Sequence, residues 1–295
     1  MRAYLYNEMK KAIEPAVTVI LTIFDRLDYF DEQLAAINAQ SVPADIWVDY
    51  TVLRPEELNK VLERYPQLKF SIRWNQNLKY HGRFNYALNA DTPYIFICDD
   101  DIIPGPKYFE HCIATLKETG DALLTAYGVI LDPDEHGYNP ARKEGYKSMN
   151  KAPLKVDMAG QSMFFPTKLL KYLNQEPPLT RENGEDLHFS YMLQKYAGVP
   201  VIVPAHLPNE PDKWGCDPIK GELYGEDDKA TWKKTNHVPI RDKVVNTYRK
   251  DGWVLVGLDR SRGESTWRRL KSLVRLFRKM RVHGANESLQ KKRRN

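Results

Sequence analysis

Three consecutive carboxylates, Asp99, Asp100 and Asp101, are the first feature of this 295-residue sequence that could do chemistry. They follow the apolar run 94–98 and precede another apolar pair. Like charges about 4 Å apart repel by about 4 kcal/mol at an effective dielectric of about 20, so the cluster needs a solvent-facing turn or a cation. Asp99 and Asp101 point the same way along a strand and can share one Mg²⁺ or Mn²⁺. A polar turn, or caps for the following helix, would explain the same residues without a metal.

A second acidic pair, Glu185 and Asp186, follows Gly184 and begins a predicted helix. Acidic residues at a helix N-terminus are stabilised by the helix dipole, by about 0.3–1 kcal/mol each, and that effect alone explains the pair. The functional alternative is a general base at the rim of a cleft, where a carboxylate removes a proton from an incoming hydroxyl.

Apolar runs rich in β-branched and aromatic residues predict the strands that must position these groups, at 16–24, 46–53, 70–74 and 94–98. Helical patterns lie between them, at 29–39, 55–65 and 83–89. The alternation predicts an α/β fold with a mostly parallel sheet flanked by helices. Ligands bind beyond the carboxyl ends of such strands, so we expect the Asp triplet at the binding edge.

The rest of the sequence is less regular. Helices are predicted at 106–119, 167–174 and 185–196, and strands at 122–131, 156–165 and 199–203. The polar stretch 132–155 is predicted to be a loop, and 204–239 a functional loop region. We expect one domain over 1–264, with a donor half (about 14–104) and an acceptor half (about 105–264), followed by a tail.

The net charge of +5 is unevenly distributed, because residues 265–295 carry eleven Lys or Arg and one acid, Glu287. Residues 265–282 have an apolar face and a basic face, which predicts an amphipathic helix on an anionic membrane surface. A helix packed onto the body with a solvated basic face is the alternative. Nucleic-acid binding is not expected, because no base-reading or stacking module accompanies the charge.

Cysteine use and hydropathy indicate the compartment. The three cysteines are an odd number without metal-ligand spacing, which predicts reduced thiols. No apolar segment approaches the length of a membrane span, and the N-terminus lacks a signal-peptide pattern. We expect a cytoplasmic protein, peripheral on the cytoplasmic face of a membrane.

Taken in order, these motifs resemble the GT-A-type glycosyltransferases, especially the inverting family 2 group, with some likeness to exostosin-type domains in the early strands. The resemblance covers about residues 14–205. It rests on Thr22-Ile-Phe-Asp25-Arg26, on Asn75 with Gly82-Arg83 and Ala87-Leu88-Asn89, on Asp99–Asp101, and on Glu185-Asp186. It implies the GT-A Rossmann-like fold, a nucleotide-sugar donor and Mn²⁺ or Mg²⁺.

The resemblance also implies roles for single residues. Thr22 and Arg26 would line the nucleotide pocket, and Asp101 would ligate the metal. Asp186 would be the catalytic base, with Glu185 beside it to contact the acceptor or hold a donor group. The remaining donor-side residues would lie near the base, ribose, diphosphate or metal waters: Asn75, Gly82, Arg83, Asp99 and Asp100.

Residues of the acceptor half are assigned by the same resemblance. His206 is the best-placed additional metal ligand and His188 the second choice, although a lone histidine beside a strand end is more often structural. Gly160 and Gln161 would line the acceptor pocket, and Trp214 offers an aromatic face to a sugar ring, which core packing explains equally well.

The expected reaction is a single in-line displacement with inversion, extending a glycan or a lipid-linked glycan. A retaining GT-A transferase is an alternative, because exostosin-like enzymes retain configuration. A nucleotidyltransferase is a second alternative, although it would usually carry a Gly-rich phosphate loop after the first strand, and 22–27 has none. A non-catalytic glycan- or membrane-binding protein is the third.

Overall fold

The computed structural model describes residues 14–24, 27–74, 76–145, 148–225, 233 and 236–258. Residues 1–255 form one unit, and 256–295 are grouped in a second unit, of which only the 3₁₀ turn η4 (Val256–Leu258) is described. The predicted amphipathic tail therefore lies outside the described residues. The first unit contains both acidic motifs.

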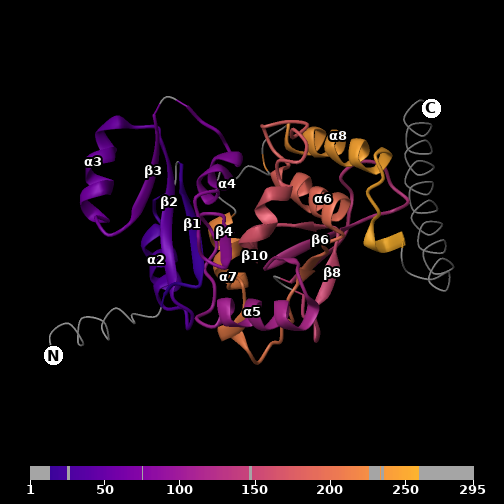
Figure 1. Cartoon of the computed structure of the whole chain (residues 1–295), viewed down its shortest axis with the longest axis horizontal. Coiled ribbons are helices and arrows are strands. Elements are labelled where there is room, and N and C mark those ends of the chain that lie inside the picture. Colours follow the sequence, from indigo (N-terminus) through magenta and orange to yellow (C-terminus); the bar gives the residue numbers. More distant parts are fainter. Residues whose placement is uncertain are drawn as a thin grey trace, which may run out of the picture. The chain divides into compact units, whose positions relative to one another are not determined.

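The first four strands form the parallel half of the main sheet. β1 (Val17–Ile23), β2 (Ala44–Val52), β3 (Lys69–Trp74) and β4 (Tyr94–Cys98) lie in the order β3-β2-β1-β4. The connecting helices are α2 (Phe30–Asn38), α3 (Pro55–Arg64) and α4 (His81–Ala87), as Figure 1 shows. Pro55 occupies the first turn of α3 and two glutamates follow it, which suits a helix start. The predicted alternation of strands and helices is confirmed.

The second half continues the sheet with mixed pairing. β10 (Ser162–Pro166) is antiparallel to β4, and β5 (Leu123–Leu124), β11 (Val201–Val203) and β8 (Leu154–Val156) follow in that order. A three-stranded sheet contains β7 (Pro140–Gly145), β6 (Tyr127–Leu131) and β9 (Met158–Ala159). The prediction of a loop over 132–155 was wrong, because it contains β7 and most of β8. β7 is mostly exposed and charged, so its pairing with β6 leaves no apolar signal.

Both faces of the central strands β1 and β4 are buried, as their near-continuous apolar sequences require, whereas no residue of the edge strand β3 is buried. Alternate residues of β4 divide between two cores: Phe96 and Cys98 face α2, α3 and α5 (Tyr108–Thr119), whereas Ile95 and Ile97 face the core that includes α4 and α6 (Glu185–Ala197). A third core joins β6, β9 and α6 to α8 (His237–Lys250). The described chain therefore confirms the predicted α/β class, with the sheet flanked by helices.

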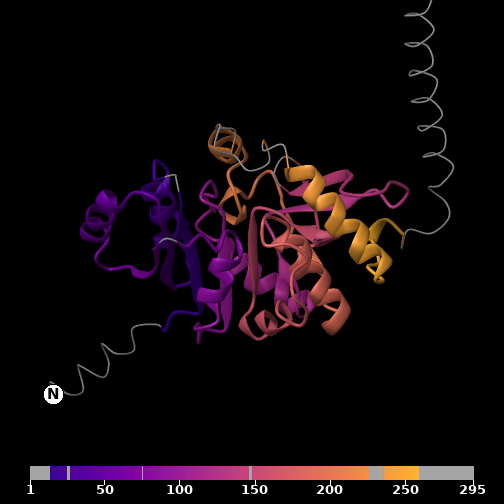
Figure 2. The same cartoon turned by 90° about the horizontal axis from the view of Figure 1, so that it is seen from above.

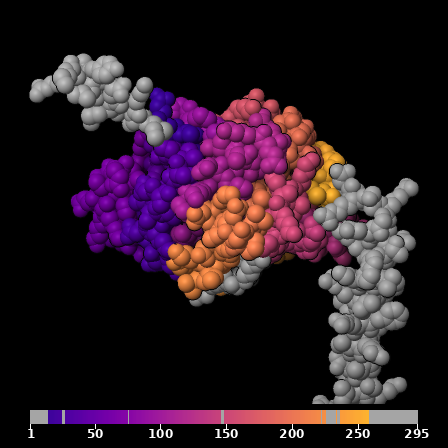
Figure 3. Space-filling model, turned by 90° about the horizontal axis from the view of Figure 1, so that it is seen from below, coloured from indigo at the N-terminus to yellow at the C-terminus, as the bar shows by residue number. Residues whose placement is uncertain are grey.

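Several shorter elements complete the first unit. The helix predicted at 167–174 is the 3₁₀ helix η1 (Thr167–Tyr172). The predicted loop region 204–239 contains η2 (Pro211–Lys213), α7 (Pro218–Gly225) and the start of α8. Figure 2 shows the orange segment that carries α7 at the edge of the molecule, and Figure 3 shows it on the surface beside the indigo and violet N-terminal part of the chain. None of the described helices combines the length and apolar character needed to cross a bilayer.

Candidate active site

The acidic turn 99–101 begins where β4 ends, at the carboxyl edge of the parallel strands. The Asp99 N–H donates to the Gln161 carbonyl at 3.0 Å. The buried amide of Gln33, on α2, donates to the carbonyls of Asp99 at 2.7 Å and Ile102 at 3.1 Å. Asp101 is buried, whereas the Asp99 side chain is 36% exposed. The turn is thus fixed from two elements, and Asp99 is the more accessible of these two carboxylates.

Arg83, on α4, joins the acidic turn to the acidic N-terminus of α6. Its Nη1 donates to Asp99 Oδ1 at 2.6 Å, and its Nη2 donates to Glu185 Oε1 at 3.0 Å. Burial lowers the pKa of this guanidinium, but the charges of Asp99 and Glu185 more than offset that effect, so the pKa is raised. Three residues that the sequence assigned to one site are therefore in direct contact.

Glu185 occupies the first turn of α6, which begins after Gly184. Gly184 has a φ of 90°, a backbone conformation that favours glycine. Burial raises the pKa of Glu185 to about 7, the adjacent charge of Asp186 adds to the rise, and Arg83 opposes it. Oε1 accepts from Arg83, and no residue in the described ranges donates to Oε2. Glu185 can therefore exchange a proton near neutral pH through an oxygen that the described part of the chain leaves open.

Asp186 points to a different neighbour, the buried guanidinium of Arg241 on α8. Arg241 Nη1 donates to Asp186 Oδ1 at 3.1 Å and Nη2 donates to Oδ2 at 2.9 Å, while the Leu187 N–H donates to Oδ1 at 2.7 Å. The guanidinium carbon lies 4.4 Å from the centre of the Tyr138 ring, and Nη1 also donates to Asn183 Oδ1 at 3.1 Å. Such a bidentate pair fixes both the position and the orientation of the carboxylate.

A group of polar side chains that we call the strand-end cluster, Thr22, Asp49 and Arg73, lies across β1, β2 and β3. Thr22 is in register with Asp49, and an Arg73 Nη donates to Asp49 Oδ2. Burial raises the pKa of Asp49 to about 6, and the charge of Arg73 opposes that rise. Thr22 Oγ1, Asp49 Oδ1, and Nε and Nη1 of Arg73 are buried without a hydrogen-bond partner among the described residues. Buried polar atoms are normally paired, so this cluster has hydrogen-bonding capacity that the described residues do not use.

Gly82, predicted to allow close approach of the donor, is instead approached by Arg73. A Cβ built at Gly82 would lie 1.2 Å from Arg73 Nη1. The absence of a side chain at this position therefore makes room for the guanidinium that pairs with Asp49.

Helix α7 lies against the acidic turn and α2. The Tyr224 ring stacks on Tyr29 with centroids 3.7 Å apart, and the Tyr224 hydroxyl donates to Glu32 at 2.6 Å. A Cβ at Gly225 would lie 3.1 Å from Asp101 Oδ2. The C-terminal end of α7 therefore covers Asp101, which explains why this residue is buried.

The predicted acceptor residues lie on the other side of the acidic turn. The Gln161 carbonyl accepts from Asp99, and Gln161 Oε1 is buried with no hydrogen-bond partner in the described chain. The Gly160 N–H donates to the Tyr127 carbonyl at 2.8 Å, and the Tyr127 ring fills the space of a Cβ at Gly160. Gln161 is thus beside the acidic turn, whereas Gly160 has a packing role against Tyr127.

The two candidate histidines have structural contacts. His206 packs edge-on against Trp214 with ring centroids 4.8 Å apart, and its Nδ1 lies 3.1 Å from the Ser148 carbonyl. His188 is buried, with Nδ1 2.5 Å from the Tyr248 hydroxyl and Nε2 2.8 Å from the Leu173 carbonyl. Both ring nitrogens of His188 are therefore engaged, which argues against a ligand role. Trp214 is half-buried, and its Nε1 donates to the Leu207 carbonyl at 2.7 Å.

The oxygen donors of the acidic turn fit a hard divalent cation. Within the described residues, no group of three or more His, Cys, Asp or Glu side chains is arranged to hold a metal ion, so His206 does not form such a group with Asp99 and Asp101. Two carboxylates suit Mg²⁺ or Mn²⁺ when waters and substrate phosphates supply the remaining ligands. Asp99 and Asp101 therefore supply at most two of the ligands that such a cation needs.

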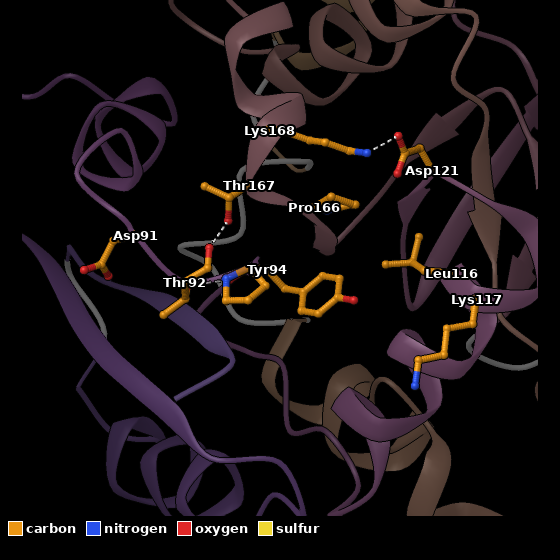
Figure 4. Close-up of a pocket in the computed structure, with 10 residues that line it drawn as sticks. Asp91, Thr92, Tyr94, Leu116, Lys117, Asp121, Pro166, Thr167 and Lys168 are labelled. Carbon is orange, nitrogen blue, oxygen red and sulfur yellow. Dashed lines mark hydrogen bonds and ion pairs between the residues drawn. The ribbon is translucent and has the colours of Figure 1, made fainter. Parts of the chain in front are cut away.

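A hollow lies at the opposite edge of the sheet, away from the acidic turn. This open pocket of about 460 Å³ is formed by the start of β4, the end of β10 and α5, as Figure 4 shows. Lys168 pairs with Asp121 at 2.7 Å, and the Thr167 hydroxyl donates to the Thr92 carbonyl at 2.6 Å. Its charged groups neutralise each other, and it is separated along β4 from the acidic turn. We therefore place the candidate site at the carboxyl edge.

Two predicted residues, Arg26 and Asn75, lie outside the described residues. Sequence reasoning missed Gln33, Asp49, Arg73 and Arg241. Asp49 and Arg73 carried a usable signal, because each is a charge inside an otherwise apolar strand. Arg241 carried none, since nothing near it in the sequence indicates its pairing with Asp186.

No protein-family model matches the sequence, and no curated protein matches it either. Similar solved structures include S. aureus TarS 1–349, at 16% identity and a TM-score of 0.47, covering 64% of this chain and 58% of that one. A second is S. aureus TarS, at 17% identity and a TM-score of 0.45, covering 66% of this chain and 37% of that one. A third is S. aureus TarS 1–349 in complex with UDP, at 16% identity and a TM-score of 0.46, covering 64% of this chain and 57% of that one. The chain thus spans little more than half the length of the first structure. At these values the likeness assigns no activity to this chain.

Proposed function

We propose that the chain is a metal-dependent GT-A-type glycosyltransferase that moves a sugar from a nucleotide-sugar donor to a hydroxyl of a glycan or lipid-linked glycan. The observation that carries the proposal is the contact series Asp99–Arg83–Glu185. It joins a carboxylate turn at the ligand-binding edge to a carboxylate pair on a different element. Sugar transfer needs both functions in one site, one for the departing diphosphate and one for the proton of the acceptor.

The strand-end cluster supports a nucleoside pocket beside the acidic turn. Asp49 offers an acceptor and Arg73 offers donors, which together match the mixed hydrogen-bonding edge of a nucleobase or ribose. Phe24 and Trp74, at the ends of β1 and β3, are exposed aromatic side chains that can stack on a base. We therefore propose that the nucleoside binds over the ends of β1 to β3, with its diphosphate toward the acidic turn.

The carboxylates of Asp99 and Asp101 would hold Mn²⁺ or Mg²⁺, which when bound neutralises charge on the departing nucleoside diphosphate. Arg83 supplies a fixed positive charge beside Asp99 and can donate to a phosphate or sugar oxygen.

In the proposed reaction, the acceptor hydroxyl loses its proton to a carboxylate at the N-terminus of α6. Its oxygen forms a bond to the anomeric carbon as the bond from that carbon to the diphosphate breaks, and the configuration inverts. The family resemblance assigns the proton acceptor to Asp186.

The acceptor is proposed to enter from the side of Gln161 and Trp214. The basic residues of 265–282 would bring the enzyme to an anionic membrane surface, where a lipid-linked glycan is found. Flotation with vesicles of neutral and anionic lipid tests this part separately: the full chain should float only with anionic vesicles, and equal flotation with both contradicts it.

A thermal-shift screen of the common nucleoside diphosphates, each with Mn²⁺ and with EDTA, tests the proposed function. We expect one nucleotide to raise the melting temperature when Mn²⁺ is present and to have little effect in EDTA. No stabilisation by any nucleotide, or equal stabilisation in EDTA, would contradict a metal-dependent donor site.

A further inference from the structure

We infer that Glu185, and not Asp186, accepts the proton of the incoming hydroxyl, and that Asp186 with Arg241 positions the helix that carries Glu185. The inference rests on the proposed glycosyl transfer and reverses the assignment that the family resemblance implies.

Both oxygens of Asp186 already accept hydrogen bonds, three in all. Oδ1 accepts from Arg241 and from the Leu187 N–H, and Oδ2 accepts from Arg241. Arg241 is itself buried and held by Asn183, so the pair is a fixed link between α6 and α8. The buried guanidinium of Arg241 takes its counter-charge from Asp186, at 2.9 Å.

The Glu185 side chain points in a different direction from that of Asp186 and accepts fewer hydrogen bonds. Consecutive helical residues project about 100° apart, so the two carboxylates face different surroundings. Glu185 faces Arg83 and, through Arg83, the acidic turn where the donor diphosphate is placed. Among the described residues, the one hydrogen bond that Glu185 accepts is from Arg83 to Oε1, compared with three for Asp186.

The charged groups around Glu185 also suit a base that works near neutral pH. They are Asp186 on its own helix, Arg83 on α4, Asp99 on the acidic turn and Arg241 on α8. Burial and the charge of Asp186 raise the pKa of Glu185, the two arginines oppose that rise, and the result is about 7. A base is most efficient when its pKa lies near the working pH.

The proton balance of the step is simple. The acceptor O–H bond breaks and its proton goes to Oε2 of Glu185. The acceptor oxygen bonds to the anomeric carbon, and the carbon–diphosphate bond breaks with its electron pair leaving on the nucleoside diphosphate. Glutamic acid at position 185 then returns its proton to water.

The test compares Glu185→Gln and Asp186→Asn, with Glu182→Gln as a matched control. Glu182 lies just before α6, and its exposed side chain pairs with Lys79, so the control removes one nearby charge outside the site. The measurements are nucleoside diphosphate binding with Mn²⁺, release of nucleoside diphosphate from the donor, and melting temperature. Asp186→Asn combined with Arg241→Met removes both buried charges and serves as the second variant if the single one does not fold.

We expect Glu185→Gln to lower kcat about 100-fold or more while nucleotide affinity stays within about threefold. Asp186→Asn, or the double variant, should lower the melting temperature and keep kcat within about tenfold while folded. A folded Asp186 variant that loses turnover, beside an active Glu185→Gln, would overturn the assignment. Absence of nucleotide binding by the wild-type chain would instead contradict the proposed function and remove the basis of the inference.

Discussion

The guanidinium of Arg83, on helix α4, donates a hydrogen bond to Oδ1 of Asp99 at 2.6 Å, and Arg83 lies 16 positions before Asp99 in the sequence. The same guanidinium reaches Glu185 on a third element. The buried guanidinium of Arg83 therefore holds two carboxylates in place. One is Asp99, which we propose binds the metal, and the other is Glu185, which we propose accepts the proton of the acceptor hydroxyl.

Replacing Arg83 with Met should weaken both the fold and donor binding. Truncating one member of a buried pair costs about 3–5 kcal/mol, and we expect the lower end because Asp99 is partly exposed. Nucleoside diphosphate affinity should fall at least about tenfold. Urea unfolding and calorimetric titration measure the two effects. Arg64→Met is the control, because Arg64 pairs with Asp31 at an exposed site and should change stability by about 1 kcal/mol or less. Unchanged nucleotide affinity in a folded Arg83→Met would contradict this role.

Replacing Asp49 with Asn should selectively weaken recognition of the nucleoside. The strand-end cluster is proposed to bind the base or ribose, so the nucleoside diphosphate should lose about tenfold in affinity, about 1.4 kcal/mol. Binding of inorganic pyrophosphate should change less. Competition titrations with both ligands make the comparison, and Asp45→Asn, at the other end of β2, is the control. Equal losses for the two ligands would place Asp49 outside the nucleoside pocket.

Replacing Gly82 with Ala should displace Arg73. Alanine normally stabilises a helix interior by about 0.5–1 kcal/mol relative to glycine. Here the new methyl group would meet Arg73 Nη1, and disturbing the buried pair with Asp49 costs more than that gain. We expect a net loss of about 1–3 kcal/mol in unfolding free energy, together with weaker nucleoside binding. A stabilised Gly82→Ala protein would show that Arg73 moves aside freely.

His81 should make the protein sensitive to acid. Burial, with the nearby charge of His188 adding to its effect, lowers the pKa of His81 to about 4 from a usual 6.5. The unfolded chain then binds the proton more readily than the folded one between about pH 6.5 and 4, so stability falls as pH falls through that window. Chemical unfolding of the wild type and His81→Gln at pH 7.5, 5.5 and 4.5 measures this. The difference between the two proteins should shrink toward acid, and a constant difference would refute the assignment.

The parallel half of the fold was predictable because β1, β2 and β4 are largely apolar and the four strands alternate with helices. The position of Asp99–Asp101 followed from that topology alone. The segment 132–155 was mispredicted, since β7 is charged and exposed and gains its backbone hydrogen bonds from β6.

The site was predictable only in part, for a related reason. A sequence shows that Glu185 and Asp186 are adjacent, but not that they face different neighbours. That difference depends on Arg241, 55 positions later, and on Arg83, 102 positions earlier. Whether a charged pair is buried depends on how helices and strands pack against each other, and the local sequence pattern does not predict that packing.

The central claim is that the acidic turn holds a cation together with a donor diphosphate. Electron paramagnetic resonance of free Mn²⁺, titrated with the wild-type chain and Asp101→Asn in the presence of the nucleoside diphosphate that stabilises the protein, tests it most directly. The account predicts that the wild type removes the free Mn²⁺ signal only when the nucleotide is present, and that Asp101→Asn weakens this binding at least about tenfold. Equal Mn²⁺ binding by the two proteins, or binding that does not depend on the nucleotide, would contradict it.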